Sequence, residues 1–197
     1  MEKSERTKQF IIEKAAAIFN MYGYAGTSIS QLTKEIGMTK GAIYGNFKDK
    51  DEIALASFDY NFSKISKIIA QVLHAKNDAN DKLIAFANFY LDNFSEISKF
   101  GGCPLLNATV DSDFAHPVLK KRVAQAVEAW IESISGIIYS GIKKEQIKKN
   151  IKPEQFASVF ASLIEGGLLL SKATGSTIQL SRNIDHIIHL VNIELRV

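Results

Sequence analysis

The chain has 197 residues, 46% of them hydrophobic, which is enough for a folded core and suits one compact domain or a small domain beside a larger one. Its single cysteine, Cys103, excludes an intramolecular disulfide framework. The charged N-terminus and the lack of a run of about 18 apolar residues predict a cytoplasmic protein without a signal peptide or a membrane span. The net charge is +3, and the excess lies at the N-terminus, because residues 1–50 hold eight of the 24 basic groups and five of the 21 acidic ones.

Periodic apolar residues predict an all-α fold of about nine helices, because strand signals are weak along almost the whole chain. We expect an N-terminal three-helix helix-turn-helix domain at residues 1–49 and a larger C-terminal helical domain at residues 50–197. The expected helices cover residues 5–22, 29–36, 40–47, 50–74, 80–98, 104–111, 117–145, 153–173 and 178–195. The three prolines, Pro104, Pro117 and Pro153, lie at expected helix boundaries.

The segment from Ser28 to Lys48 reads as a helix, a turn that contains glycine, and a second helix. Ser28 can cap the first helix, and Gln31 has the position that a capping box requires. Gly37 follows where a left-handed residue ends a helix at little cost, and Thr39 is a good N-cap for the second helix. This spacing is typical of a helix-turn-helix motif, and a plain helical hairpin inside a core would show the same spacing.

The outer face of the second helix carries short residues and a few hydrogen-bond donors, which suits entry into the major groove of double-stranded DNA. We expect Lys40, Tyr44 and Asn46 to make most of the groove and adjacent phosphate contacts. The hydroxyl groups and the last lysine of the expected set should mainly hold phosphates. The set is Ser28, Thr39, Lys40, Gly41, Ala42, Tyr44, Gly45, Asn46 and Lys50.

From about Glu5 to Phe62 the sequence resembles the DNA-binding domain of TetR-type bacterial transcriptional regulators. The residues that carry the resemblance are Ala15-Ala16, Phe19, Gly23-Tyr24, Thr27-Ser28-Ile29, Ile36-Gly37-Met38-Thr39, Gly41-Ala42-Ile43-Tyr44, Phe47, Lys50 and Glu52. An amphipathic helix precedes the motif, and another helix follows it, with Asp49 as its cap and Glu52 as the capping-box partner. The sequence departs from the family at Thr33, where such regulators mostly have alanine, and we expect a small shift in the crossing angle of the two helices.

The resemblance implies a dimeric, ligand-responsive regulator without a cofactor, most often a repressor that a small molecule releases from a near-palindromic operator. It also implies that residues 50–197 bind this effector and form the homodimer. The long helix at residues 50–74 begins in the DNA-binding core and continues into the C-terminal part, so it can transmit a change from one site to the other. The sequence identifies neither the effector nor the operator.

Large apolar residues surround an irregular loop, Gly101–Asn107, which resembles the loop that opens the sixth helix beside the ligand cavity in one subgroup of the family. We expect a small, mostly apolar or aromatic ligand there. The expected wall residues are Phe62, Phe86, Tyr90, Leu106, Trp130 and Ile134, with Asn107 as a polar anchor. Ordinary core packing explains most such stripes as well. Cys103 in the loop is either a thiol sensor or a small buried apolar group.

The last two expected helices carry apolar stripes that resemble the family's four-helix dimer interface. The expected interface residues are Phe160, Ile164, Leu168, Ile187 and Val191. The run Glu165–Leu168 resembles the family's penultimate helix, where small residues allow a close approach. In the alternative arrangement, both stripes face inward on the same chain.

Two other classes of protein compete with a DNA-binding regulator. An enzyme that handles a small molecule is disfavoured, because the sequence offers no phosphate-binding glycine loop and no nucleophile with a recognisable base nearby. His186 and His189 could present two metal ligands, but no cysteine or carboxylate cluster completes a site, so we expect neither catalytic nor metal-binding residues. A helical adaptor that binds only protein would not need the residues around Tyr44.

Overall fold

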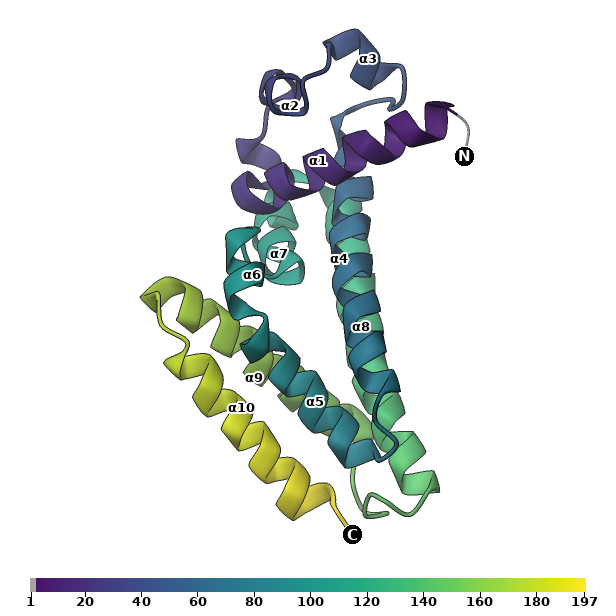
Figure 1. The fold of residues 1–197 in the computed structure, drawn as a ribbon, viewed down its shortest axis with the longest axis vertical. Helices are drawn as coiled ribbons and strands as arrows, with labels where there is room; N and C mark the ends of the chain where they lie inside the picture. Colours follow the sequence, from purple (N-terminus) through teal and green to yellow (C-terminus); the bar gives the residue numbers. More distant parts are fainter. Residues whose placement is uncertain (1–2) are drawn as a thin grey trace. The chain divides into compact units, whose positions relative to one another are not determined.

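The computed structural model describes residues 3–197, and their side chains apart from those of residues 3 and 113–115. The predicted all-α fold is confirmed, since the described residues form ten α-helices and a terminal π-helical turn, with one isolated β-bridge between Ile147 and Arg196. Figure 1 shows these elements. Their bounds are α1 (Lys3–Gly26), α2 (Ile29–Ile36), α3 (Lys40–Tyr44), α4 (Lys50–His74), α5 (Ala79–Asp92), α6 (Phe94–Lys99), α7 (Pro104–Ala115), α8 (Pro117–Lys143), α9 (Pro153–Thr174), α10 (Ile178–Leu190) and η1 (Val191–Leu195).

Several helix boundaries differ from the prediction. The helix expected at residues 80–98 is two helices, because Asn93 leaves the helical conformation (φ −106°, ψ 9°) and its Nδ2 donates to the carbonyl of Phe89 at 2.8 Å. α1 continues past Gly23 with a kink at that residue, where φ is 73° and ψ is 172°. α3 is shorter than the expected range of 40–47, and a turn follows it.

The chain folds into two compact units. Unit 1 consists of Met1–Ile65 and Lys99–Ala126, and unit 2 consists of Ser66–Ser98 and Val127–Val197. This division differs from the predicted boundary after residue 49, because α7 and the first part of α8 group with the helix-turn-helix. α4 and α8 each continue from one unit into the other.

The core of unit 1 joins α1, α2 and α3 to the beginning of α4. Its buried apolar side chains are Ile11, Ala15, Ile18, Leu32, Ile36, Ile43, Phe47 and Ile53. On α1 and α2 they recur at three- or four-residue spacing, which places them on one face of each helix. Complete burial of a large apolar side chain contributes roughly 1.5–3 kcal/mol, so this small core is enough to hold α2 and α3 together against α1.

The core of unit 2 is rich in aromatic rings, and α5, α9 and α10 pack against one another around it (Figure 1). The ring of Phe86 lies edge-on to Phe160, with centroids 5.7 Å apart, and is stacked with Tyr90 at 6.2 Å. Gly167 permits the close packing of α9 on α10, because a Cβ atom there would lie 2.9 Å from Cδ1 of Leu180. These contacts leave little freedom for the inner faces of α9 and α10.

All five residues predicted for the dimer interface are buried within the single chain. Each exposes at most 4% of its surface: Phe160, Ile164, Leu168, Ile187 and Val191. The choice of these side chains was therefore wrong, because a helix turns its most regular apolar stripe toward the core of its own chain. α9 keeps a second apolar face exposed, with Val159 at 44%, Leu169 at 49% and Leu170 at 48%.

α9 also corrects the expectation that no segment of the chain is apolar enough to span a membrane. By length and composition alone this helix meets such a criterion, with a mean hydropathy of 1.4 over an 18-residue window. The core helix of a soluble protein meets the same criterion, and α9 buries its inner face in unit 2. Its apolar composition is therefore explained by its place in the core.

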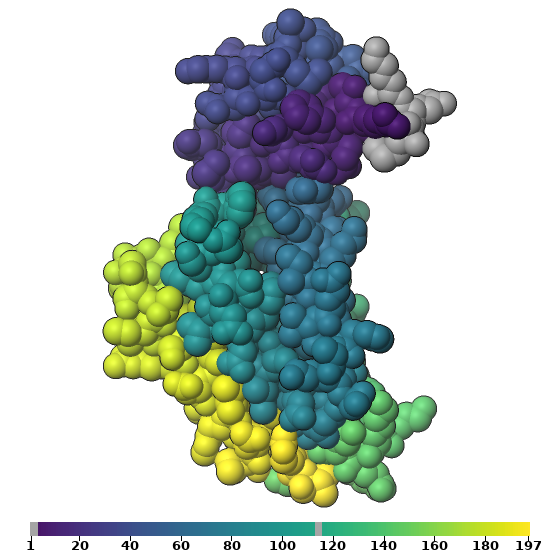
Figure 2. Space-filling model, viewed as in Figure 1, coloured from purple at the N-terminus to yellow at the C-terminus, as the bar shows by residue number. Residues whose placement is uncertain are grey.

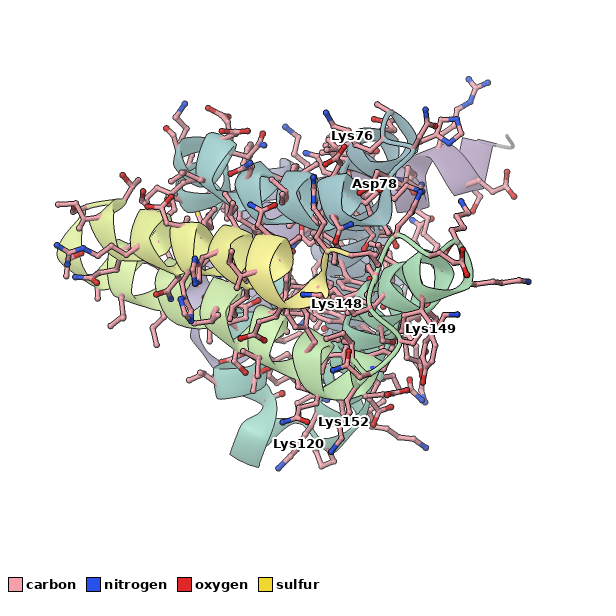
Figure 3. All side chains as sticks on the ribbon, turned by 90° about the horizontal axis from the view of Figure 1, so that it is seen from below. Lys76, Asp78, Lys120, Lys148, Lys149 and Lys152 are labelled. Atoms are coloured by element: carbon pink, nitrogen blue, oxygen red, sulfur yellow. The ribbon has the colours of Figure 1, made fainter. Side chains whose placement is uncertain are left out.

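Positive charge also gathers outside the N-terminal part, on the loop that joins α8 to α9. Residues 142–152 hold five lysines and one glutamate. Figure 3 shows Lys148 and Lys149 on this loop, and the backbone N–H of Lys148 donates to the carbonyl of Leu195 at 2.8 Å. The only ion pair described for this loop joins Lys149 to Glu145 at 3.5 Å, with both side chains 77% exposed. Lys149 is therefore a solvated lysine in unit 2.

Candidate DNA-binding surface

α2 begins and ends as its sequence predicts. The side-chain oxygen of Ser28 accepts a hydrogen bond from the backbone N–H of Gln31 at 3.1 Å, which confirms Ser28 as the N-cap. At the other end Gly37 adopts the left-handed conformation with φ 75°, and its N–H donates to the carbonyl of Thr33 at 3.0 Å. Both ends of the helix are thus capped by residues adjacent to it in the sequence.

α3 is anchored from beneath and open on its outer side. The hydroxyl oxygen of Thr39 accepts from the N–H of Ala42 at 3.2 Å, so Thr39 caps the helix, and Ile43 is fully buried in the core of unit 1. Lys40, Gly41, Tyr44 and Gly45 are exposed, with Tyr44 at 37%. The outer surface of α2 and α3 is visible in Figure 2, where this segment is blue. The structure therefore exposes the outer side of α3, with Lys40, Gly41, Tyr44 and Gly45, to solvent; this surface is the reading face.

A hollow of ≈ 320 Å³ lies on the surface between α2 and α3. Its lining residues are Ile29, Ser30, Thr33, Lys34, Met38, Thr39 and Lys40. Two lysines and three hydroxyl groups give this surface the donors that phosphate oxygens accept. Lys34 is not among the residues predicted to contact DNA, although its place near the end of α2 and its exposure mark it as a candidate phosphate contact.

Besides the caps Ser28 and Thr39, two further residues of the expected set, Asn46 and Lys50, also have hydrogen-bond partners within the chain. Nδ2 of Asn46 donates to the carbonyl of Ala42 at 2.9 Å, so this amide closes the end of α3. Nζ of Lys50 donates to the carbonyl of Tyr24 at 2.6 Å and lies 4.0 Å from the centre of the Tyr24 ring. Burial lowers the pKa of Lys50 from its usual value, while nearby carboxylates, led by Asp111, oppose this shift. Lys50 therefore has a structural role that the sequence pattern did not indicate.

The start of α4 is held by the predicted capping pair, with one change of partner. Oδ1 of Asp49 accepts from the backbone N–H of Glu52 at 2.9 Å, and Oε2 of Glu52 accepts from the backbone N–H of Lys48 at 2.8 Å. The other carboxylate oxygen of Glu52 accepts from Nζ of Lys8 at 2.8 Å. The Lys8 ammonium is the main cause that holds the pKa of Glu52 below its usual value. The side chain of Lys48 remains exposed beside the reading face.

The expected ligand-wall residues fall into both compact units. Those in unit 1 are Phe62, Leu106 and Asn107, and those in unit 2 are Phe86, Tyr90, Trp130 and Ile134. The unit 2 set is buried, and the Tyr90 and Trp130 rings meet edge-on at 6.1 Å. Nε1 of Trp130 is buried and has no hydrogen-bond partner in the part of the chain that the structure describes. In unit 1, Nδ2 of Asn107 donates to the carbonyl of Gly101 at 2.9 Å, so this amide is engaged within the chain rather than free to anchor a ligand.

A cavity of ≈ 40 Å³ lies inside unit 1. Its lining residues are Phe19, Asn20, Gly23, Tyr24, Ala54, Phe58, Asn61, Pro104, Asn107, Ala108, Asp111 and Leu119. This space has room for water but not for a drug-sized ligand, because such ligands fill roughly 300–1,000 Å³. Of the expected wall residues only Asn107 borders it.

The sequence also raises two minor candidates: Cys103 as a thiol sensor, and the pair His186 and His189 as metal ligands. Cys103 is buried, with 7% of its surface exposed, which suits a small apolar group at the start of α7. The rings of His186 and His189 are exposed and stacked, with centroids 6.4 Å apart. Among the described residues no group of three potential metal ligands includes them.

Comparison with known proteins agrees with the geometry. Residues 11–57 match the model of bacterial regulatory proteins of the tetR family, and residues 79–187 match the tetracyclin repressor-like C-terminal domain. A solved TetR-family transcriptional regulator from Cytophaga hutchinsonii is 34% identical, with a TM-score of 0.94 over 100% of this chain and 98% of that one. A TetR transcriptional regulator from Chloroflexus aurantiacus is 30% identical, with a TM-score of 0.94 and 100% of both chains covered.

Curated relatives show the same likeness at lower identity. The HTH-type transcriptional regulator LmrA of Bacillus subtilis is 24% identical over 84% of this chain and 86% of its own length. The HTH-type transcriptional repressor DhaR of a Mycobacterium species is 22% identical over 84% and 82%. The matched family models cover both the helix-turn-helix and more than half of the chain after it. The chain therefore belongs to the TetR family and is a DNA-binding transcriptional regulator.

Proposed function

We propose that this regulator is a cytoplasmic repressor that binds a near-palindromic operator as a homodimer and leaves it when a small, mostly apolar molecule binds. The observation that carries the proposal is the exposed outer face of α3, held at both ends by caps and from beneath by Ile43. The relative DhaR is a transcriptional repressor, which supports repression over activation. No catalytic activity and no cofactor are expected.

The DNA contacts divide between the two helices of the motif. Lys40 and Tyr44 are exposed, and Nζ of Lys40 lies 5.8 Å from the centre of the Tyr44 ring, so they form one patch for the major groove. Lys34 and Lys48 are exposed lysines on either side of this patch and suit phosphate contacts. Ser28, Thr39, Asn46 and Lys50 then act chiefly by holding the reading helices in place.

Selection from a random duplex library by the wild-type protein tests the DNA-reading part. A near-palindromic motif should be enriched at moderate salt. Lys40→Ala should weaken binding to the selected duplex and reduce the slope of log K against log salt by about 1. Lys149→Ala removes the same charge from the solvated loop of unit 2 and is the matched control, which should leave the slope unchanged. A library that yields no enriched motif would refute DNA reading by this chain.

The exposed face of α9 supports a dimer. Val159, Leu169 and Leu170 are 44–49% exposed, and Gly166 lies on the same helix. A Cβ atom at Gly166 would meet nothing within 4 Å, whereas one at Gly167 would meet α10. Packing among the described residues does not require a glycine at position 166. Close approach by a second copy of α9 would require one. A dimer with two-fold symmetry places two reading helices on half-sites roughly 34–36 Å apart.

The buried Trp130 supports a ligand site in unit 2. Its Nε1–H has no acceptor among the described residues, and leaving a buried donor unpaired costs about 1–3 kcal/mol. An aromatic molecule with one hydrogen-bond acceptor, seated against Tyr90 and Trp130, would remove that cost. Because Trp130 is the only tryptophan, a molecule that quenches its fluorescence should also release the selected duplex. A molecule that releases DNA equally well from the Trp130→Phe variant, without quenching the wild type, would place the site elsewhere.

A further inference from the structure

The kink in α1 breaks the hydrogen bonding of that helix just before the helix-turn-helix. Gly23 has φ 73° and ψ 172°, a conformation that does not continue an α-helix. In a regular helix the N–H of Tyr24 would donate to the carbonyl of Asn20, four residues earlier. Both groups therefore need other partners, because unpaired backbone groups inside a folded chain are costly.

α7 supplies a partner for each of these two groups. The carboxylate of Asp111 accepts from the N–H of Tyr24, and it also accepts from the N–H of Ala25 at 3.4 Å. Nδ2 of Asn107 donates to the carbonyl of Asn20 at 3.1 Å. Asn107 and Asp111 are four residues apart on α7 and so share one face of it. One turn of α7 thus replaces the helical bond that the kink removes.

Two glycines make this contact possible. A Cβ atom at Gly23 would lie 2.7 Å from Oδ1 of Asp111, and one at Gly101 would lie 2.6 Å from the carbonyl oxygen of Asn20. Both glycines also have positive φ, at 73° and 94°. The Gly23-Tyr24 and Gly101-Gly102 motifs, which are far apart in the sequence, are therefore two sides of one contact.

The same turn of α1 is fixed on its other side by α4. The carbonyl of Tyr24 accepts from Nζ of Lys50, and the phenolic O–H of Tyr24 donates to the carboxylate of Asp51. Ser28, the cap of α2, follows four residues later. The direction in which the chain enters α2 and α3 is consequently set by α7 together with the start of α4.

We propose that Asn107 and Asp111 are positioning residues for DNA reading: they hold the end of α1 from α7, and release of this contact misplaces α2 and α3. The proposal rests on the proposed function and names the two residues through which α7 positions α2 and α3. Neither residue lies on the exposed face of α3. Their effect on DNA is therefore on the arrangement of the reading face and not on its phosphate contacts.

The test is Asp111→Asn, which keeps the size of the side chain and removes its charge and one acceptor. Asp92→Asn, at an exposed position of α5 in unit 2, is the matched control. Hydrogen exchange of peptides that cover residues 20–36 should accelerate at least about tenfold in Asp111→Asn and stay unchanged in Asp92→Asn. Affinity for the duplex selected by the wild type should fall about tenfold, with the salt slope unchanged, since no phosphate contact is lost.

A second variant changes the contact on its α1 side, at Gly23. Gly23→Ala should also weaken binding, and the double variant with Asp111→Asn should be no weaker than the more severe single variant, because both remove the same contact. Losses that simply multiply would show general destabilisation and overturn the proposal. Unchanged exchange, or faster exchange with wild-type affinity, would also overturn it. If the wild type selects no duplex, the proposed function fails, while the exchange experiment still decides whether α7 holds α1.

Discussion

Replacing either of two leucines of α9 by aspartate, one buried and one exposed, distinguishes the effect of a core residue from that of an interface residue. Leu168 is 4% exposed and Leu170 is 48% exposed, although only one residue lies between them. Removing a buried leucine side chain costs about 2–5 kcal/mol, and an unpaired buried carboxylate adds several more. The sum for Leu168→Asp is comparable with the whole stability of a domain, about 5–15 kcal/mol. We expect this variant to be largely unfolded.

Leu170→Asp should leave the protomer folded and weaken the dimer. In the free chain the change costs under about 1 kcal/mol, because half of the side chain is already in water. In the dimer it occurs twice, and loss of the remaining burial costs about 1 kcal/mol in each chain, half of what full burial of a leucine contributes. The total of about 2 kcal/mol lowers the association constant about thirtyfold, and desolvation of two carboxylates lowers it further.

Sedimentation and urea unfolding measure these two effects separately. Wild-type protein and Val118→Asp, which changes another exposed apolar residue, should sediment as dimers at micromolar concentration. Leu170→Asp should sediment as a folded monomer and lose affinity for the palindrome. A Leu170→Asp dimer as tight as the wild type would show that the interface is not on this face of α9. A Leu168→Asp variant as stable as the wild type would contradict the burial on which the argument depends.

Three further outcomes follow from the contacts described above. Glu52→Gln should destabilise the protein by about 0.5 kcal/mol at neutral pH, since its bond to Lys8 is partly exposed to solvent. Because the pKa of Glu52 is lowered in the folded state, urea titrations should show this difference shrink as the pH falls below the usual carboxyl value and vanish below the lowered folded-state pKa. Hydrogen bonding to Asp51 raises the pKa of Tyr24 to about 12, so this phenol should ionise last among the tyrosines in an alkaline absorbance titration. Its contribution to stability should be lost as the pH rises toward that value. Asp51→Asn should lower the pKa of Tyr24. Gly141→Ala should lower the melting temperature through about 1–3 kcal/mol of overpacking, because the new methyl would meet side chains at 2.6 Å.

Most of the fold could be predicted because its signals are local. Ser28, Gly37 and Thr39 fix the ends of α2 and the start of α3 by contacts within a few residues, and the structure has α2 at the predicted bounds. The break at Asn93 could not be predicted in this way, because the apolar pattern continues across it and only its side-chain bond to the preceding turn ends α5. Periodicity thus locates helices better than it locates interruptions within them.

The outer side of a helix is harder to predict than the helix itself. Leu168, Leu169 and Leu170 are consecutive, so they point in three directions, and it is packing within the folded chain that buries the first and leaves the other two exposed. The same limit applies to Lys50, whose ammonium turns to the carbonyl of Tyr24 instead of toward solvent. Contacts between residues distant in sequence, such as that of Asp111 with Tyr24, leave no periodic signal at all.

Unit 1 is assembled from two separate stretches of chain, and this affects when a newly made protein becomes able to bind DNA. Asp111 comes 87 residues after Tyr24, so the helix-turn-helix leaves the ribosome long before the helix that holds it. Until α7 has been made and the intervening loop has closed, the end of α1 lacks its carboxylate partner. We expect nascent chains that stop before α7 to bind operator DNA poorly, so that unfinished copies do not occupy the sites of finished ones.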